Sequence, residues 1–267
     1  MKFINYCICC DSKNVIMHQS YMRQFVVDRM LGNTQKDNEL GTHCSLIHCQ
    51  DCDYVGSDVR FSLEEEARYY HNYGSDEWIA HRCRYDGEEI RDIMKAYEVG
   101  EYPKNRKSQT GKLLAKHINL GTISNVLDFG GNKGEMIPDE LAHTDRYVLE
   151  TEERSVAEGI KSISKDNNDL RVDLLICSQT LEHVSDPNGL INYMKKYIRP
   201  GGWIYLEVPY ERVPTNLEHH GFHEHINCFS GISLTTLALR NNIELVATAM
   251  LVPIPHITSI AVLGKIK

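Results

Sequence analysis

The second part of this sequence contains several short runs of apolar residues without polar alternation, and they restrict the possible folds more than any other feature. Runs rich in Val, Ile and Leu are typical of strands that are buried on both faces of a parallel sheet. The predicted strands span residues 124–129, 147–150, 172–178 and 203–208, with a shorter candidate at GIKSI. Helices are predicted between them at residues 134–142 and 155–159, and after Asp186 and Pro187. Strands that alternate with helices predict an open, doubly wound α/β sheet.

The end of the sequence adds two further strand candidates. The segments IELVATAM and PHITSIAVLGKI are apolar and are separated by a proline-containing turn. Strands joined in this way pair antiparallel, and such a pair is compatible with one edge of a parallel sheet. We therefore expect an antiparallel pair at the edge of the doubly wound sheet.

The first part of the chain, up to about residue 103, is rich in cysteine and then in helix signals. The segments SLEEEARYYHNYG and DGEEIRDIMKAYEV begin with Ser62 and Asp86, and each has a glutamate three residues later, which is the spacing of a capping box. The stretch GEYPKNRKSQTGK combines Gly, Pro and basic residues, which is typical of a surface connector. We therefore expect two domains, residues 1–103 and 104–267.

Charge and apolar content narrow the classes of partner. The 267 residues are 42% hydrophobic, which is enough to build a buried core. The formal net charge of −8 argues against nucleic acid as a partner, because proteins that bind it usually present a basic face. No window approaches the run of about 18 apolar residues that spans a membrane, and the first 20 residues lack the apolar core of a signal peptide. We expect a cytoplasmic protein without a membrane partner.

Cysteines cluster near the start of the chain, where six of the nine lie between Cys7 and Cys52. Cys7 with Cys10, and Cys49 with Cys52, form two Cys-x2-Cys pairs whose four thiolates can close a tetrahedron round zinc. A site closed by four protein ligands is structural, so this zinc is expected to hold the fold. Buried cysteines without metal are the alternative, and possible substitutes for one ligand are Cys9, Cys44, His43 and His48.

A glycine-rich turn, VLDFGGNKG, follows the first predicted strand of the second part. Ligands of doubly wound sheets bind at the carboxyl ends of strands, where glycines allow the backbone to approach closely. Glu150 follows the next strand, about 20 residues later, where an acidic side chain can accept two ribose hydroxyls. A nucleoside cofactor, dinucleotide or adenosyl, suits both features. The alternative for the glycine stretch is a tight turn that binds no ligand, and the alternative for Glu150 is a solvated charge at the end of a strand.

Four segments together resemble a known family. In order and spacing, VLDFGGNKG, YVLETE, VDLLICSQTLEHVSDP and RPGGWIYLEVP are similar to the class I S-adenosylmethionine-dependent methyltransferases. The combination of LEHVSDP with RPGG is the most specific part, because dinucleotide dehydrogenases do not usually carry it. The resemblance covers residues 113–267 and implies a Rossmann-like sheet of seven strands, methyl transfer, and S-adenosylmethionine as cofactor.

The same resemblance implies which residues contact the cofactor. The glycine turn would line the methionine and ribose side of the cofactor, and Glu150 would hold the ribose. Ser178 and Gln179, which lie in the third of the four segments, would meet the methionyl end. Asn132 stands where the family pattern has its middle glycine, and Asn tolerates positive φ. The implied cofactor-binding residues are Asp128, Gly130, Gly131, Gly134, Glu150, Ser178 and Gln179.

A paired cysteine module before a methyltransferase domain is similar to the sugar methyltransferases of deoxysugar and surface-glycan pathways. FHEHINCFS is also similar to the Tyr-His-Glu-His segment with which those enzymes surround the acceptor, and the matching positions are His223, Glu224 and His225. Phe222 replaces the tyrosine. The sequence also stops just after its final predicted strand, whereas the carbon-methylating sugar enzymes continue into a further C-terminal domain that helps to bind the nucleotide-sugar. Transfer to oxygen is therefore expected. Carbon methylation of a nucleotide-linked deoxysugar is the alternative.

A hydroxyl acceptor must lose a proton, and a histidine, with an ordinary pKa of about 6.5, is the usual base. We expect His225 as base with Glu224 orienting or charging it, and His223 as acceptor ligand, with the two histidines exchangeable. His183 is the other candidate, with packing as its alternative role, and the histidines could instead hold a catalytic metal. The expected acceptor is a sugar, a nucleotide-sugar or a phosphorylated precursor in surface polysaccharide biosynthesis.

Two rival functions remain open at this point. An RNA base methyltransferase can also begin with a zinc module, although the first 60 residues show no basic excess. A non-catalytic zinc-containing binding protein would use the first part to recruit a partner.

Overall fold

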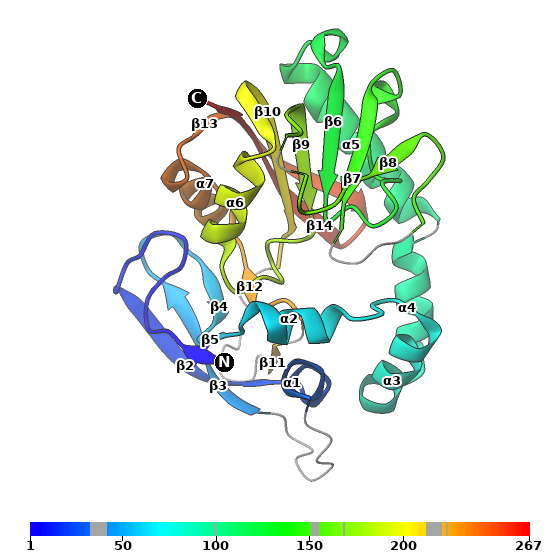
Figure 1. Ribbon diagram of the computed structural model, residues 1–267. Coiled ribbons are helices and arrows are strands. Elements are labelled where there is room, and N and C mark those ends of the chain that lie inside the picture. Colours follow the sequence, from blue (N-terminus) through cyan, green and yellow to red (C-terminus); the bar gives the residue numbers. More distant parts are fainter. Residues whose placement is uncertain (33–41, 99, 151–154, 168, 212–220, 223) are drawn as a thin grey trace.

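The structure is a computed structural model (Figure 1) that describes residues 1–32, 42–98, 100–150, 155–167, 169–211, 221–222 and 224–267. Within these residues the strands form one sheet of seven strands, one of five and one of two. No helix in the described ranges is both long and apolar enough to cross a membrane.

The seven-stranded sheet forms the frame of the second part of the chain. In spatial order its strands are β13 (Ile243–Ile254), β14 (Ile257–Ile266), β10 (Ile198–Pro209), β9 (Val172–Ser178), β6 (Asn125–Phe129), β7 (Asp145–Leu149) and β8 (Ile160–Ser162). Strand β14 pairs antiparallel with both of its neighbours, and the other pairings are parallel. The predicted Rossmann-like α/β fold with a terminal antiparallel strand is therefore confirmed.

Helices cover the sheet on both faces (Figure 1). Helix α5 (Glu101–His117) contributes Leu114 to a buried cluster with Val126 of β6. Helices α6 (Pro187–Lys195) and α7 (Gly231–Arg240) belong to a second cluster, which contains the next residue of β6, Leu127. Because successive strand residues point to opposite faces, both faces of β6 are buried, which explains its continuous apolar run.

Local signals correctly predicted α6 and wrongly predicted two other helices. Asp186 caps α6 by accepting a hydrogen bond from the Gly189 N–H. Residues 134–142 instead form turns and the short 3-10 helix η2 (Asp139–Leu141), and residues 155–159 contain no helix. Gly134 and Gly159 have φ values of 77° and 73°, which lie outside the helical region.

The five-stranded sheet combines both parts of the chain. Its order is β11 (Gly221–Phe222), β2 (Val15–Met22), β3 (Thr42–Cys49), β4 (Val55–Ser57) and β12 (Asn227–Cys228). Strands β11 and β12 follow β10 in sequence, so this sheet takes strands from both sides of the predicted boundary at residue 103. The small sheet pairs β1 (Lys2–Phe3) with β5 (Val59–Arg60).

The predicted surface connector is wrong, because residues 101–112 lie in α5. Pro103 occupies the first turn of this helix, where a missing N–H costs nothing. The remaining helices are α1 (Gln24–Leu31), α2 (Leu63–Tyr70), α3 (Asp76–Asp86), α4 (Glu89–Glu98) and the 3-10 helix η1 (Leu120–Thr122).

Of the two predicted capping boxes, one is confirmed. Ser62 and Glu65 form a capping box at the start of α2. Asp86 is not a cap but the last residue of α3, where its carboxylate pairs with Arg82 and Arg23. Gly87, with a φ of 93°, ends that helix before α4 begins.

Candidate functional site

A pocket of about 170 Å³ lies at the carboxyl ends of β6 and β9. Five of the seven predicted cofactor residues line it, and the remaining two, Gly134 and Glu150, lie at the same turn. Its lining residues are Arg106, Asp128, Gly130, Gly131, Asn132, Met136, Ser178 and Gln179. This is the edge at which ligands bind in open parallel sheets.

The glycine turn folds tightly over Asp128. Gly130 and Asn132 have φ values of 70° and 53°, so Asn132 adopts the left-handed conformation that the sequence required of it. A Cβ at Gly131 would overlap the Asp128 carboxylate, which explains the glycine at that position. The Asn132 N–H donates a hydrogen bond to the Glu150 carboxylate and thereby holds Glu150 beside the turn.

Asp128 presents an unpaired oxygen at the pocket wall. Its side chain is buried, and Oδ2 has no hydrogen-bond partner in the described part of the chain. Burial raises the pKa of Asp128 to about 7, against the influence of Arg106 and with added repulsion from Glu150 and Glu207. A buried acceptor of this kind can take a hydrogen bond from a bound ligand.

Replacing Asp128 by asparagine is expected to stabilise the ligand-free protein at pH 8 and not at pH 4. The ordinary pKa of 3.8 applies in the unfolded chain, so folding stability falls as the pH rises from about 4 to 7 and remains lower above that range. We expect the unfolding temperature at pH 8 to rise by at least about 4 °C, measured by thermal denaturation at both pH values. The exposed Asp169→Asn variant is the control, and an equal rise at pH 4 would contradict the linkage.

Sequence reasoning missed Arg106 and Glu207, which meet at the pocket. Arg106 Nε donates to Glu207 Oε1 at 2.9 Å, and Arg106 Nη2 donates to Ser178 Oγ at 2.5 Å. Ser178 Oγ in turn donates to Glu207 Oε2 at 2.6 Å. Arg106 was missed because it lies in the stretch that was expected to be a surface connector. Glu207 could have been found, because it is an acidic residue within an otherwise apolar predicted strand.

A second group of polar side chains lies on the loop that follows the pocket residues of β9. Glu182 and His183 come from this loop, and His225 comes from the segment before β12. The two imidazole rings lie edge to face with centroids 4.7 Å apart, and His183 Nε2 is 3.6 Å from Glu182 Oε1. One ligand atom of each residue lies within 4.8 Å of the others, so the three could hold a metal ion.

His225 is hydrogen-bonded to a residue that the sequence did not suggest. Its Nδ1 lies 2.5 Å from Glu211 Oε1, whereas Glu224 pairs with Arg82 Nη1 at 2.8 Å. Burial lowers the pKa of His225, but Glu211, Glu182 and Glu224 together raise it to about 9. Glu224 therefore contributes charge, and Glu211 contributes orientation. His223 lies outside the described residues.

His183 is held differently. Its Nδ1 lies 3.3 Å from the backbone oxygen of Glu224, and its ring packs edge to face on Tyr70. Burial, together with the charge on His225, lowers the pKa of His183 to about 3. The imidazole is therefore neutral at pH 7.

Asn227 fastens the loop that carries Glu182 and His183. Its amide nitrogen donates to the backbone oxygens of Leu181 and Val184, both at 2.8 Å. Its Oδ1 accepts hydrogen bonds from Tyr54 at 2.7 Å and from Arg60 at 2.8 Å. The first part of the chain thus supports this loop through a buried junction.

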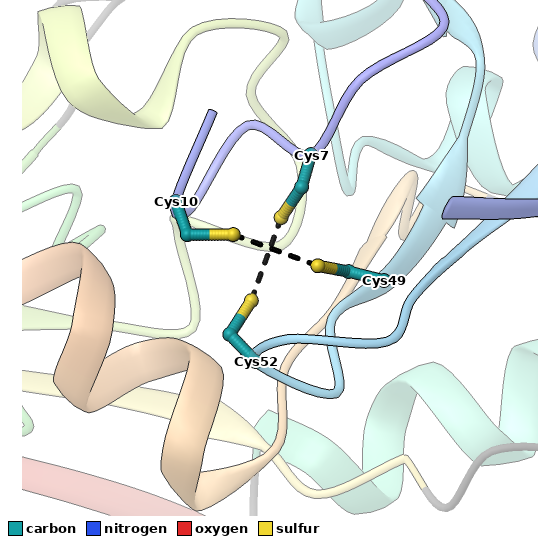
Figure 2. Close-up of side chains that lie close together, drawn as sticks. All are labelled: Cys7, Cys10, Cys49 and Cys52. Atoms are coloured by element: carbon teal, nitrogen blue, oxygen red, sulfur yellow. Dashed lines mark hydrogen bonds between the residues drawn. The ribbon is translucent and has the colours of Figure 1, made fainter. Parts of the chain in front are cut away.

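The four cysteines of the two Cys-x2-Cys pairs converge (Figure 2). Cys7 and Cys10 lie between β1 and β2, and Cys49 and Cys52 lie at the turn from β3 to β4. The Sγ atoms of Cys7 and Cys52, and those of Cys10 and Cys49, are 3.5 Å apart. This is too far for a disulfide of about 2 Å and close to the spacing of about 3.8 Å in tetrahedral zinc–thiolate sites.

Comparison with known families decides the class of the protein. Residues 101–248 match the family described as "Methyltransferase domain", which is more than half of the chain and begins at the first residue of α5. The chain belongs to this methyltransferase family. It is an S-adenosylmethionine-dependent enzyme, as the four sequence segments implied.

Solved structures to which this chain is similar include three methyltransferases. The Burkholderia thailandensis 1,6-didemethyltoxoflavin-N1-methyltransferase, with 1,6-didemethyltoxoflavin and S-adenosylhomocysteine bound, has a TM-score of 0.51 at 14% identity, and the match covers 82% of this chain and 98% of the other. The N-methyltransferase NodS from Bradyrhizobium japonicum WM9 has a TM-score of 0.47 at 14% identity, covering 64% and 90%. The glycopeptide N-methyltransferase MtfA has a TM-score of 0.46 at 12% identity, covering 65% and 99%. Comparison with curated proteins gave no match.

Proposed function

We propose that this methyltransferase transfers the methyl group of S-adenosylmethionine to a hydroxyl of a small polar acceptor. The acceptor class that we propose is a sugar, a nucleotide-sugar or a phosphorylated precursor of surface-glycan biosynthesis. One observation carries the proposal: the loop that ends the cofactor pocket at Gln179 continues directly into Glu182 and His183, beside His225. Cofactor and proton-handling groups therefore share one edge of the sheet.

The residues of the pocket suit the parts of the cofactor. The turn at Gly130 and Gly131 lets the backbone approach the methionine and ribose, and Glu150 can accept hydrogen bonds from the ribose hydroxyls. Ser178 and Gln179 would meet the methionyl end. Arg106, held in place by Glu207, adds a positive charge there for the methionyl carboxylate.

Methyl transfer from a sulfonium is an in-line displacement, in which the enzyme mainly has to align the acceptor and exclude water. The acceptor hydroxyl must also lose its proton. We propose His225, in its deprotonated form, as the group that receives it, because the Glu211 carboxylate fixes the ring through Nδ1 and leaves Nε2 for the substrate. Since the pKa of His225 is raised to about 9, the share of active enzyme should increase as the pH rises from 7 toward 9. His223 stays a prediction as acceptor ligand, and His183 a prediction as second base.

Replacement of His225 by asparagine is expected to lower turnover by about 10²–10⁴-fold with little change in cofactor affinity. Release of S-adenosylhomocysteine would be measured in a screen of nucleotide-sugars and sugar phosphates, and the variant compared on any acceptor that responds. The exposed His256→Asn variant is the control. A screen without a responding acceptor would contradict the proposed acceptor class, and full turnover in the variant would contradict the role of His225.

We further propose that the four cysteines bind a structural zinc ion and organise residues 1–103 as a zinc-binding and lid domain before a methyltransferase domain at 104–267. The cysteine turn is fastened to the methyltransferase helices: Arg240 of α7 donates to the Cys9 backbone oxygen at 2.8 Å, and Asn188 of α6 donates to that of Ile8 at 2.6 Å. All nine cysteines are free of disulfides, which is typical of the reducing cytoplasm that we propose as location.

A further inference from the structure

We propose that Glu182, His183 and His225 bind a divalent transition-metal cation, as a second metal site separate from the four cysteines. One ligand atom from each lies within 4.8 Å of the others, a distance that coordination can close. The site itself depends only on the positions of these three side chains. The role of the cation rests on the proposed function, because it concerns the acceptor hydroxyl.

The hydrogen bonds of both histidines match those of metal ligands. A histidine that binds metal through one nitrogen usually gives its other nitrogen to a carboxylate or a backbone carbonyl. His225 Nδ1 lies against the Glu211 carboxylate, and His183 Nδ1 lies against the Glu224 carbonyl oxygen. Each ring therefore keeps Nε2 for a further partner, and His183 Nε2 faces Glu182 at 3.6 Å.

The Glu182 carboxylate supplies an independent argument. It is fully buried, and neither of its oxygens has a hydrogen bond within the described residues. Glu207 is buried to the same degree, but its oxygens bond Arg106, Ser178 and Tyr205. Burying an unpaired carboxylate is costly unless a cation or a proton compensates its charge. A metal ion between Glu182 and the two Nε2 atoms would provide that compensation.

The donor set selects the kind of cation. Two imidazoles and one carboxylate suit Mn²⁺, Fe²⁺, Co²⁺, Ni²⁺ or Zn²⁺, whereas Mg²⁺ and Ca²⁺ prefer oxygen ligands alone. Three protein ligands leave positions open for an exogenous oxygen atom. The site thus differs from the closed cysteine cluster both in chemistry and in access to a small ligand.

A cation here would take over the work proposed for the His225 nitrogen. It would bind the acceptor oxygen and lower the pKa of the hydroxyl, so that the proton leaves to water. The methyl group then passes from sulfur to oxygen: one C–S bond breaks, one C–O bond forms, and neutral S-adenosylhomocysteine leaves. The reaction stays the proposed one, and only the group that activates the hydroxyl changes.

The test is titration of the zinc-loaded protein with Mn²⁺, in which the electron paramagnetic resonance signal of free Mn²⁺ measures how much of the ion is unbound. Mn²⁺ stands lowest in the affinity order of the divalent metals, so it does not displace zinc from thiolates. We expect one bound Mn²⁺ per chain in the micromolar range. Glu182→Gln and His225→Asn should weaken binding by about 100-fold or more, and Glu211→Gln by about 10-fold or more.

Two variants control for nonspecific binding, and Glu182→Gln itself is checked for damage to the fold. His256→Asn and Asp145→Asn change an exposed imidazole and an exposed carboxylate and should leave Mn²⁺ affinity unchanged. Glu182→Gln keeps the shape of the side chain and removes a buried charge, so zinc content and near-ultraviolet circular dichroism should match those of the unaltered protein.

The cation site is overturned if neither Mn²⁺ nor Co²⁺ binds below millimolar concentration. It is also overturned if Glu182→Gln leaves the affinity for the cation unchanged. Calorimetric titration with S-adenosylmethionine separates this result from the proposed function. Cofactor binding without cation binding overturns the site and leaves the proposed function standing. Cation binding without cofactor binding supports the site and contradicts the proposed function.

Discussion

Replacement of Cys49 by serine is expected to lower the unfolding temperature by more than about 10 °C and to release the zinc ion that we propose for the cysteine cluster. Structural zinc contributes about 10–16 kcal/mol of apparent binding free energy in small zinc domains, as much as the whole stability of a typical domain, about 5–15 kcal/mol. Cys49 is fully buried, and its Sγ lies 3.5 Å from that of Cys10. Serine would leave the site with three thiolates and an open face.

The effect should extend beyond the cysteine turn. The same turn receives hydrogen bonds from Arg240 and Asn188, and the first part of the chain supports the loop at residues 181–184 through Tyr54 and Asn227. We therefore expect loss of zinc to loosen the loop that carries His183 as well. Hydrogen exchange of residues 181–184, with and without a chelator, would show this loosening.

Cys83→Ser is the matched control for Cys49→Ser, because Cys83 is also buried but lies outside the cluster. Its replacement should cost about 1–3 kcal/mol and leave the zinc content unchanged. Thermal denaturation and elemental analysis of both variants measure the difference. Equal destabilisation in the two variants, or a zinc content that survives Cys49→Ser, would contradict the structural zinc site.

Replacement of Glu150 by alanine is expected to weaken S-adenosylmethionine binding by about 100-fold or more. Two hydrogen bonds to a carboxylate contribute about 1.5–3 kcal/mol each, and a ribose offers two adjacent hydroxyls. Glu150 is already held beside the glycine turn by the Asn132 N–H, so little ordering is needed on binding. Glu150→Gln keeps one acceptor oxygen and should lose less.

Calorimetric titration with S-adenosylmethionine and S-adenosylhomocysteine measures this prediction. Glu158→Ala removes an exposed acid that precedes β8 and should leave both affinities unchanged. Both ligands carry the ribose, so Glu150→Ala should weaken them equally. An unchanged affinity would show that the ribose binds elsewhere and that Glu150 serves the turn only.

Much of the fold could be predicted because its signals are local. The apolar runs of β6, β9 and β10 follow from burial on both faces of a parallel sheet, and Asp186 with Pro187 marks the start of α6. The predicted helix at 134–142 failed because the turn that follows β6 needs positive φ at Gly134. The connector prediction failed because Gly and Pro in α5 resemble a linker when their packing is unknown.

By itself, the sequence determined the class of fold, the methyltransferase family and the two cysteine pairs, since each depends on residue types at short, regular spacings. Only the tertiary structure decided which distant side chains meet: Arg106 with Glu207, and His225 with Glu211 and Glu182. The pairing of β4 with β12 in the five-stranded sheet likewise joins residues that are about 170 positions apart in the sequence. Such contacts arise from chain topology and from the burial of charge, which forces an acid in the interior to find a partner wherever the fold supplies one.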